Sequence, residues 1–329
     1  MGINIMEIEP HKVSRDLSGY IIYIYGEGKT GKTTLATQAG GALLLAFEKG
    51  YNALPGIYPV DITSWKDVRD IKKQLGTDAA KARYKSIIFD TIDIAGAMCE
   101  KWICAQAGVD SVADVADFGG GWVKLKREFE NTVREITQMG YAVYFISHDK
   151  DKEFKRKDGT KYNQIIPTCP TSFNNIAKNA ADVYAFAEKY TDESGQARVR
   201  LILRSVDNSI DTGSRFKYIQ PTCEMSYEAL KQAILNAIDK EAEIMGGQFV
   251  TDEREEVKSN TSYDFEGLIN EFNEITMNMM EEDPAYYQPR IIDLVTRVLG
   301  PGKKVNEASI QQVELIAEIV ESLKDMKKK

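Results

Sequence analysis

One short motif near the amino terminus constrains the fold of this chain more than any other feature. The residues Gly26-Glu27-Gly28-Lys29-Thr30-Gly31-Lys32-Thr33 satisfy the pattern G-x-x-x-x-G-K-[ST]. The motif directly follows the apolar, strand-like run Tyr20–Tyr25 and directly precedes the helical run Thr34–Ala39, which is the context that a phosphate-binding loop requires. A Gly-rich turn that contains Lys and Thr by chance is the alternative, and the flanking elements make it the weaker one.

The loop predicts a binding site for ATP with Mg²⁺. Its glycines allow backbone N–H groups to turn inward around phosphate oxygens. We expect Lys32 to contact the outer phosphates and Thr33 to hold the magnesium ion. The predicted nucleotide-binding residues are Gly26, Glu27, Gly28, Lys29, Thr30, Gly31, Lys32, Thr33 and Thr34.

From Gly19 to about Glu188, strand-like apolar runs alternate with amphipathic, helix-like stretches. Phe118–Met139 is one of the predicted helices, because its apolar residues recur at helical spacing. Alternation of this kind predicts an α/β fold with a mainly parallel sheet flanked by helices. The strand-like runs are Tyr20–Tyr25, Ala42–Phe47, Ser86–Phe89, Tyr141–Ser147 and Asp182–Ala187.

The predicted core occupies residues 1–245. Its last elements are a β-rich segment at Ala197–Ser205, a candidate neighbouring strand at Arg215–Ile219 and a helix at Ser226–Glu243. Residues 246–262 contain a Gly-Gly pair, many charges and few large apolar side chains, so we expect a linker there.

Residues 263–329 are predicted to form a small helical C-terminal module. The segments Tyr263–Met280, Pro289–Leu299 and Ser309–Met326 each show helical periodicity. This module lies outside the alternating strand and helix pattern, and we therefore treat it as a separate domain.

Composition excludes several classes of protein. The chain has 329 residues, 43% of them hydrophobic and 28% charged, as expected of a folded globular protein. Its 42 Lys and Arg residues and 50 Asp and Glu residues give a net charge of -8, so a nucleic-acid surface would have to be local. No apolar run approaches the ~18 residues that cross a bilayer. The first residues also lack the regions of a signal peptide, and we expect a cytoplasmic location without membrane contact.

The four cysteines are Cys99, Cys104, Cys169 and Cys223, and they lack paired short CxxC spacings. The chain has two histidines, His11 and His148, and so offers poor material for a zinc site. We expect reduced, mostly buried thiols.

Three polar residues that follow predicted strands are candidates for the chemistry at the phosphates. Asp90 is expected to hold a magnesium-bound water, although many strands end in Asp as a turn or cap residue. Glu48 is expected to activate the attacking water, with a solvated loop residue as the alternative. His148 is a candidate phosphate sensor, with a structural histidine as an equal alternative. Ligands bind beyond the carboxyl ends of parallel strands, so all three should face Lys32, whereas Asp93 is expected to start a helix.

Together these motifs resemble the RecA-type ATPase core, and more closely the phage-encoded RecA-like ATPases that act as single-strand annealing proteins. The resemblance rests on the phosphate-binding loop and on the segments Gly40–Gly50, Ile88–Thr91 and Phe118–Trp122. It covers roughly Gly19 to Ala237 and leaves the helical module outside.

The resemblance implies roles for the strand-end residues. Glu48 would be the activating carboxylate, Asp90 the metal acid, and Ser147-His148 the sensor at the place where relatives commonly carry a polar amide. The histidine is a departure from that pattern.

The resemblance also implies self-association into a ring or a filament. Such enzymes complete the site with a cation from the adjacent subunit, which would lie near Arg204 in this chain. Arg215 and Lys217 are substitutes for that role, and an ordinary strand-surface arginine is the alternative for each of them.

Family members bind single-stranded DNA through two loops, which correspond to Ala107–Gly121 and Asp149–Gln164. The first is acidic, whereas the second carries cations near Phe154 and Tyr162. Cations can follow phosphates while aromatic rings stack on bases, but a solvated hairpin would have a similar sequence. The predicted DNA-binding cations are Lys150, Lys152, Lys155, Arg156, Lys157 and Lys161.

Our first functional hypothesis is an ATP-hydrolysing RecA-like protein that binds single-stranded DNA and promotes annealing or recombination, for a phage in the bacterial cytoplasm. The second is a nucleotide-switched loader or scaffold ATPase that acts through protein partners. In either case a single-strand DNA-binding protein or another replication protein could dock on the helical module. A P-loop kinase of a small substrate is the third and weakest hypothesis, because a strand-end Glu suits an assembly ATPase better.

Overall fold

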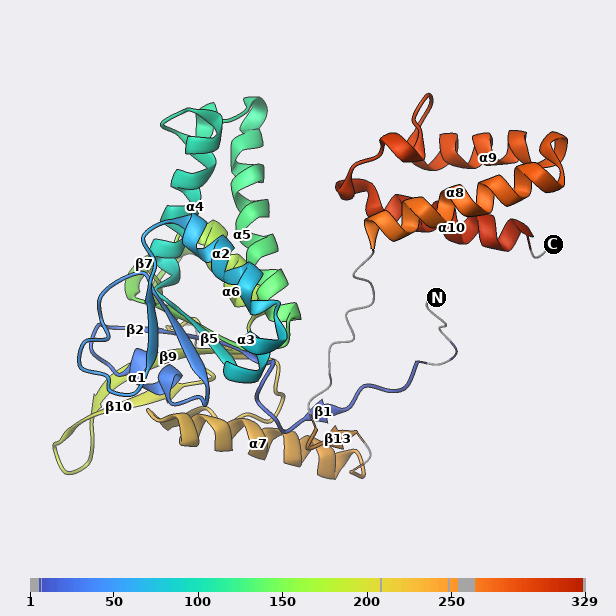
Figure 1. The fold of residues 1–329 in the computed structure, drawn as a ribbon. Coiled ribbons are helices and arrows are strands. Elements are labelled where there is room, and N and C mark those ends of the chain that lie inside the picture. The colour runs from blue at the N-terminus through green and yellow to red at the C-terminus, as the bar shows by residue number, and fades with distance from the viewer. Residues whose placement is uncertain (1–5, 7, 208, 248, 254–263, 328–329) are drawn as a thin grey trace. The chain divides into compact units, whose positions relative to one another are not determined.

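The computed structural model describes residues 6, 8–207, 209–247, 249–253 and 264–327. The chain separates into two compact units, Met1–Val257 and Lys258–Lys329. Figure 1 traces the elements of each unit by colour. Within the described ranges, no helix has both the length and the apolar character that crossing a membrane requires.

A nine-stranded sheet forms the centre of the first unit. Its strands are β2 (Ile21–Gly26), β3 (Ala42–Ala46), β4 (Tyr58–Asp61), β5 (Ser86–Asp90), β6 (Ala142–Ser147), β9 (Val183–Thr191), β10 (Ala197–Ile202), β11 (Gly213–Ser214) and β12 (Thr222–Glu224). They follow the order β12-β10-β9-β2-β6-β5-β3-β4, with β11 paired to β9. The strands from β9 to β4 are parallel to one another, whereas β10, β11 and β12 are antiparallel to their neighbours. The predicted α/β fold with a mainly parallel sheet is confirmed.

Helices cover both faces of this sheet, as Figure 1 shows. One face packs against α1 (Lys32–Thr37) and α7 (Tyr227–Ile244). The other face packs against α2 (Trp65–Leu75), α4 (Ile92–Ala107), α5 (Gly120–Gln138) and α6 (Thr171–Ala180), while α3 (Asp78–Arg83) precedes β5. Burial on both faces explains why β2, β3, β5 and β6 are buried at every position rather than at alternate ones.

The strand order brings the sequence motifs to one edge of the sheet. Strand β6 lies between β2 and β5, with Tyr25 opposite Ser147 and Ile146 opposite Asp90. Ala46 of β3 is in turn opposite Asp90. Because these strands are parallel and in matching register, their carboxyl ends lie side by side, and the residues that follow them can share one site.

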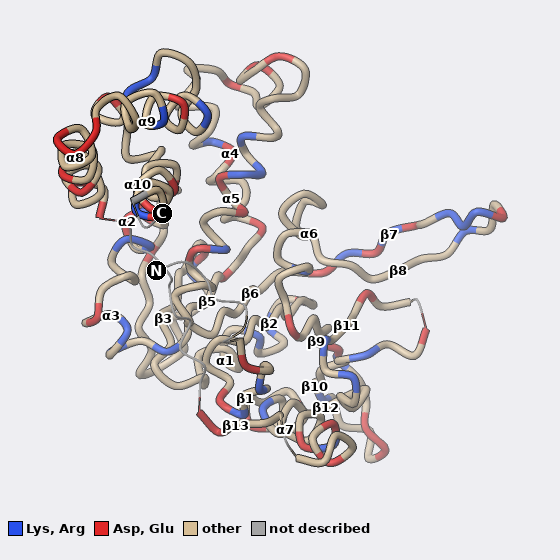
Figure 2. The backbone as a smooth tube through the Cα atoms, turned by 90° about the vertical axis from the view of Figure 1, so that its right-hand side faces the viewer, with Lys and Arg blue, Asp and Glu red and all other residues tan. Residues whose placement is uncertain are grey.

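Two hairpins extend from the layers of the first unit. The strands β7 (Asp149–Lys155) and β8 (Lys161–Pro167) form a separate antiparallel pair that directly follows β6. Figure 2 shows this pair projecting away from the sheet. The helices α4 and α5 form the other hairpin, and two short 3₁₀ turns, Val112–Asp114 and Asp117–Gly119, connect them.

The structure corrects the predicted strand at Arg215–Ile219. This segment is a turn, in which the Ile219 N–H donates to the Phe216 carbonyl over 3.2 Å. The antiparallel neighbour of β10 is β12 instead. The apolar residues of this turn still pack against the core. Ile219 is buried, and the partly buried Phe216 ring packs edge-on against Tyr20 at 5.4 Å between centroids.

The predicted linker at 246–262 falls partly on residues 248 and 254–262, which lie outside the described residues. In the described part, Val250–Thr251 (β13) pairs in parallel with Val13–Ser14 (β1). These two residues therefore belong to a small ribbon of the first unit. Their partner lies at the other end of that unit in the sequence, so no local pattern predicts the pairing.

The second unit contains α8 (Phe265–Glu282), α9 (Pro284–Leu299) and α10 (Val313–Lys327). Helix α9 begins at Pro284 rather than at the predicted Pro289, because Asp283 caps it by accepting from the Tyr286 N–H at 3.1 Å. Buried residues from all three helices and from the 3₁₀ turn Val305–Glu307 form one apolar core. They are Met279, Tyr287, Leu294, Val305, Ile316, Ile319, Val320 and Leu323.

Candidate nucleotide site

Backbone geometry explains two of the glycines of the phosphate-binding loop. Gly31 precedes α1 with a φ of 92°, in the left-handed region that residues with a side chain disfavour. Gly26 has a φ of 150°, and a Cβ atom there would lie 2.6 Å from the Ala187 carbonyl oxygen of β9. A side chain at either position would distort the loop, so these glycines fix its path between β2 and α1.

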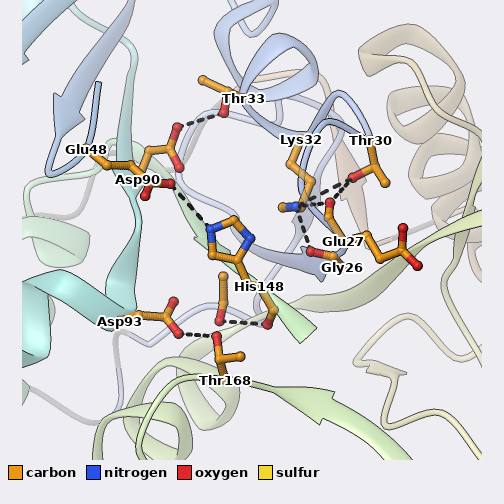
Figure 3. Close-up of polar contacts among 11 residues, drawn as sticks. Gly26, Glu27, Thr30, Lys32, Thr33, Glu48, Asp90, Asp93, His148 and Thr168 are labelled. Carbon is orange, nitrogen blue, oxygen red and sulfur yellow. Dashed lines mark hydrogen bonds and ion pairs between the residues drawn. The ribbon is translucent and has the colours of Figure 1, made fainter. Parts of the chain in front are cut away.

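Lys32 folds over this loop. Its side chain is almost completely buried, and Nζ donates to the carbonyl oxygens of Gly26 at 2.8 Å and Glu27 at 2.7 Å (Figure 3). Burial lowers the pKa of the Lys32 ammonium, and the nearby Asp90 carboxylate acts in the opposite direction. Phosphate oxygens are stronger acceptors than carbonyls, so an anionic ligand would compete well for this ammonium.

Thr33 and Asp90 lie together beside the lysine. The Thr33 hydroxyl donates to Asp90 Oδ2 at 2.7 Å (Figure 3). Burial raises the pKa of the Asp90 carboxyl, and the hydrogen bond from Thr33 opposes that shift. A hydroxyl and a carboxylate are the hard oxygen donors that Mg²⁺ prefers.

The charges around the loop also fit a divalent cation. Four carboxylates, Asp90, Asp149, Glu48 and Asp93, lie near enough to act on the Lys32 ammonium. A nucleotide polyphosphate would add further negative charge, so a cation between the carboxylates and the phosphates would be favoured. In the part of the chain that the structure describes, no three His, Cys, Asp or Glu side chains form a metal cluster. The Thr33 hydroxyl and the Asp90 carboxylate are therefore a small donor set, and such a set fits Mg²⁺, which takes many of its ligands from phosphates and water.

Glu48 and His148 are in direct contact. His148 Nε2 lies 3.4 Å from Glu48 Oε1, and both side chains are partly exposed to solvent (Figure 3). The Ser147 hydroxyl donates to the His148 carbonyl oxygen at 3.1 Å. The structure thus joins the predicted water-activating carboxylate and the predicted sensor, a contact that their distance in the sequence did not reveal.

A pocket of about 590 Å³ contains most of the predicted nucleotide-site residues. This volume is in the range of small-molecule binding sites. Its lining residues are Gly28, Lys29, Thr30, Gly31, Lys32, Thr33, Thr34, Glu48, Lys49, Gly50, Ala53, Leu54, Asp90, Ile146 and His148. The loop and the three strand-end residues therefore surround one space, with His148 between the P-loop strand and the strand of Asp90.

Glu27 is directed away from this lining and forms an ion pair with Lys189 of β9. Sequence analysis did not single out Lys189. No local pattern could have revealed it, because the two residues are 162 positions apart.

Arg204 is not brought to the pocket. It follows β10, which is antiparallel to β9, so it lies toward the end of the sheet opposite to the P-loop. Its guanidinium donates to the carbonyl oxygens of Lys217 at 3.2 Å and Phe216 at 3.1 Å. Arg204 therefore does not reach the pocket of its own chain in this structure.

The six predicted DNA-binding cations lie on β7, β8 and the turn between them. In this hairpin Phe154 is opposite Tyr162, and their rings stack at 5.6 Å between centroids. The Asp158 carboxylate closes the turn by accepting from the Thr160 N–H at 2.9 Å, and Gly159 has a φ of 90°. The cations are Lys150, Lys152, Lys155, Arg156, Lys157 and Lys161.

Comparison with known proteins agrees with this geometry. A family model described as an AAA domain matches residues 18–225, which include every residue of the pocket. The chain is also similar to the SPbeta prophage-derived uncharacterized protein YorG of Bacillus subtilis strain 168. The two are 29% identical over 336 aligned residues, which cover 99% of each chain.

Proposed function

We propose that this chain, which belongs to the AAA domain family of nucleotide-binding ATPases, hydrolyses ATP with Mg²⁺. It would couple this hydrolysis to the binding of single-stranded DNA. The coupled hydrolysis and binding would promote annealing or recombination of DNA strands. One observation carries the proposal: the cationic and aromatic hairpin begins at the residue directly after His148, which contacts Glu48.

In the proposed hydrolysis, Glu48 accepts a proton from the attacking water and His148 holds the Glu48 carboxylate by direct contact. Lys32 neutralises charge that develops on the outer phosphate oxygens. Thr33 and Asp90 would hold Mg²⁺, which supplies further charge neutralisation when bound.

The hairpin separates its charges by face. Successive side chains of a strand point to opposite faces, so Lys150, Lys152, Phe154 and Arg156 share one face with Tyr162. Lys152 Nζ lies 5.0 Å from the Phe154 ring centroid, and Arg156 Cζ lies 4.6 Å from that of Tyr162. The acidic residues Asp149, Asp151 and Glu153 lie on the other face with Lys155 and Lys161.

This separation supports contact with a single strand of DNA. The whole loop has a small excess of positive charge, but the aromatic face of β7 carries cations without acids. Cations that follow phosphates and aromatic rings that stack on bases are the two elements of sequence-independent single-strand binding. On the other face the Lys161 ammonium is engaged with Glu153 at 2.8 Å.

Replacing Lys152 and Arg156 together with Ala should therefore weaken binding to a single-stranded oligonucleotide. The logarithm of the binding constant falls linearly with the logarithm of the salt concentration, and loss of two phosphate contacts should make this slope shallower by about 1.4, which is roughly 0.7 for each contact. The matched control is the Lys155→Ala, Lys161→Ala double variant, which removes the same charge from the opposite face. Fluorescence anisotropy at several salt concentrations measures both. Equal losses of oligonucleotide affinity in the two double variants would contradict recognition of DNA by the aromatic face.

The cation that completes the site is proposed to come from a neighbouring copy of the chain. Arg204 lies away from its own pocket, so it could act on phosphates only in trans. Its planar guanidinium suits phosphate oxygens, and binding there would replace its present carbonyl partners.

Mixing Arg204→Ala with Glu48→Gln subunits should restore ATPase activity that each variant lacks alone. In a random mixture, roughly a quarter of head-to-tail interfaces would join an intact Glu48 to an intact Arg204. Steady-state phosphate release across mixing ratios measures this effect. The assignment of Arg204 would be wrong if Arg204→Ala alone were fully active, or if the mixture stayed inactive although the subunits co-assemble. Arg215 or Lys217 would then be the candidate cation.

The prophage-derived relative is compatible with a role in phage DNA metabolism, because it matches nearly the whole chain. The loader or scaffold hypothesis also has support from one feature. The described surface of the C-terminal unit exposes large apolar side chains, which favour a protein partner. They include Met277, Tyr286, Ile292 and Ile310.

A further inference from the structure

Thr168 lies at the root of the β7–β8 hairpin and makes three hydrogen bonds to three different parts of the first unit. Its N–H donates to the His148 carbonyl oxygen at 2.9 Å. Its carbonyl oxygen accepts from Lys150 Nζ at 3.1 Å. Its hydroxyl donates to Asp93 Oδ1 in the first turn of α4 (Figure 3). One residue thus contacts the nucleotide side, the cationic face of the hairpin and the helix that follows β5.

Asp93 holds the Thr168 side chain in place by accepting its hydroxyl hydrogen bond. It follows the Asp90 strand by one helical turn, yet it does not line the nucleotide pocket. Its second oxygen, Oδ2, is buried without a hydrogen-bond partner in the described structure. The hydroxyl of Thr168 therefore orients this carboxylate by donating to its other oxygen, and the Asp93 side chain in turn fixes the hairpin root.

The hairpin has a second attachment, which reaches strand β8 three residues before Thr168. The hydroxyl of Tyr25, the residue directly before the phosphate-binding loop, lies 3.0 Å from the Ile165 carbonyl oxygen and 2.8 Å from the Asp211 carbonyl oxygen, and these two acceptors share its proton. This contact does not pass through His148. It therefore allows a general loosening of the hairpin to be distinguished from the loss of one specific connection.

We propose that Thr168 is a positioning residue that couples the nucleotide site to the hairpin. A nucleotide that displaces the Glu48–His148 pair shifts the His148 backbone, and Thr168 transmits the shift to the hairpin because it is bonded to that backbone and fixed by Asp93. The coupling also runs from the hairpin to the nucleotide site, because a DNA phosphate that binds the Lys150 ammonium breaks the hydrogen bond from that ammonium to the Thr168 carbonyl oxygen. This second half rests on the proposed DNA binding, whereas the first half does not.

The test compares Thr168→Val, which keeps the shape but loses the hydroxyl, with Thr168→Ser, which keeps the hydroxyl. Hydrogen exchange of residues 149–167 is measured with and without a non-hydrolysable ATP analogue and Mg²⁺. The wild type and Thr168→Ser should change exchange in this segment on nucleotide binding, and Thr168→Val should lose most of that change while still binding the analogue. Tyr25→Phe should keep it.

A second readout is the ratio of the DNA-stimulated to the basal ATPase rate. Allosteric couplings are typically about 5–150-fold, and Thr168→Val should bring this ratio close to 1 with the basal rate retained. Thr168→Ser should restore it. If the wild type fails to bind single-stranded DNA, the proposed function fails, but the hydrogen-exchange comparison still decides the role of Thr168.

The proposal is overturned if nucleotide leaves hairpin exchange unchanged in the wild type, if Thr168→Val responds like the wild type, or if Tyr25→Phe loses the response as fully. Loss of the Thr168 hydroxyl leaves a buried carboxylate oxygen unsatisfied, which can destabilise the fold. If Thr168→Val does not fold, Asp93→Asn and Asp93→Ala replace it. The Asn amide oxygen can still accept from Thr168 and should keep the response, which Ala should lose.

Discussion

A Glu48→Gln variant should bind ATP as well as the wild type and hydrolyse it about 10²–10⁴-fold more slowly, which is the usual contribution of a general base. Glu48 lies in the pocket, 3.4 Å from His148 Nε2, and the amide retains its size and this contact. It removes only the carboxylate that accepts a proton from water. Equilibrium binding of a fluorescent ATP analogue and single-turnover hydrolysis separate these two properties.

Asp93→Asn is the matched control, because it neutralises another carboxylate near Lys32 that is bonded to Thr168 and lies outside the pocket lining. It should retain the basal rate. Normal turnover by Glu48→Gln, together with a large loss in Asp93→Asn, would reverse the assignment and make Asp93 the base.

Replacing Lys32 with Ala should have the second large effect. We expect ATP binding to weaken by about 10–150-fold, corresponding to the roughly 1.5–3 kcal/mol of a charged hydrogen bond. The chemical step should slow further by about 10²–10³-fold, because charge on the phosphate oxygens loses its preorganised partner. Calorimetric titration with ATP and Mg²⁺, followed by single-turnover hydrolysis, measures the two effects.

The fold should persist in this variant, because the Lys32 ammonium is a buried charge whose pKa burial lowers, and its bonds go to carbonyls of its own loop. Lys73→Ala, in the exposed last turn of α2, removes the same charge away from the pocket and should leave binding unchanged. Normal hydrolysis by Lys32→Ala at saturating ATP would contradict the assignment of the phosphate-binding loop.

The parts of this account that sequence could predict depend on local chemistry. The loop pattern and its flanking strand and helix lie within a few residues of one another, so they can be recognised together. Asp90, Glu48 and His148 were predicted because each follows an apolar strand, and parallel strands end at a common edge. The structure places all three in one pocket with Lys32.

The remaining features depend on contacts between distant segments. Asp93 and Thr168 are 75 positions apart, and each has an ordinary local sequence context. The position of Arg204 depends on the antiparallel direction of β10, and an apolar run alone does not show whether a strand is parallel or antiparallel. The two faces of the hairpin became visible only with its register, since the charge of the segment as a whole is nearly balanced.

Helix boundaries show the same limit on a smaller scale. The predicted helix from Phe118 begins at Gly120, because Phe118 has a φ of 53° and is fully exposed. Two prolines precede the apolar pattern of α9, and either could have started the helix. The Asp283 cap selected Pro284, and Pro289 lies within the helix.

ATP hydrolysis by the wild-type chain, measured with and without single-stranded DNA at several salt concentrations, tests the central claim most directly. The account predicts a basal rate that depends on Mg²⁺, is lost in Glu48→Gln, and rises when single-stranded DNA is added at low salt. Hydrolysis that DNA does not change, in a protein that shows no single-strand binding at low salt, would contradict the claim and favour the nucleotide-switched loader.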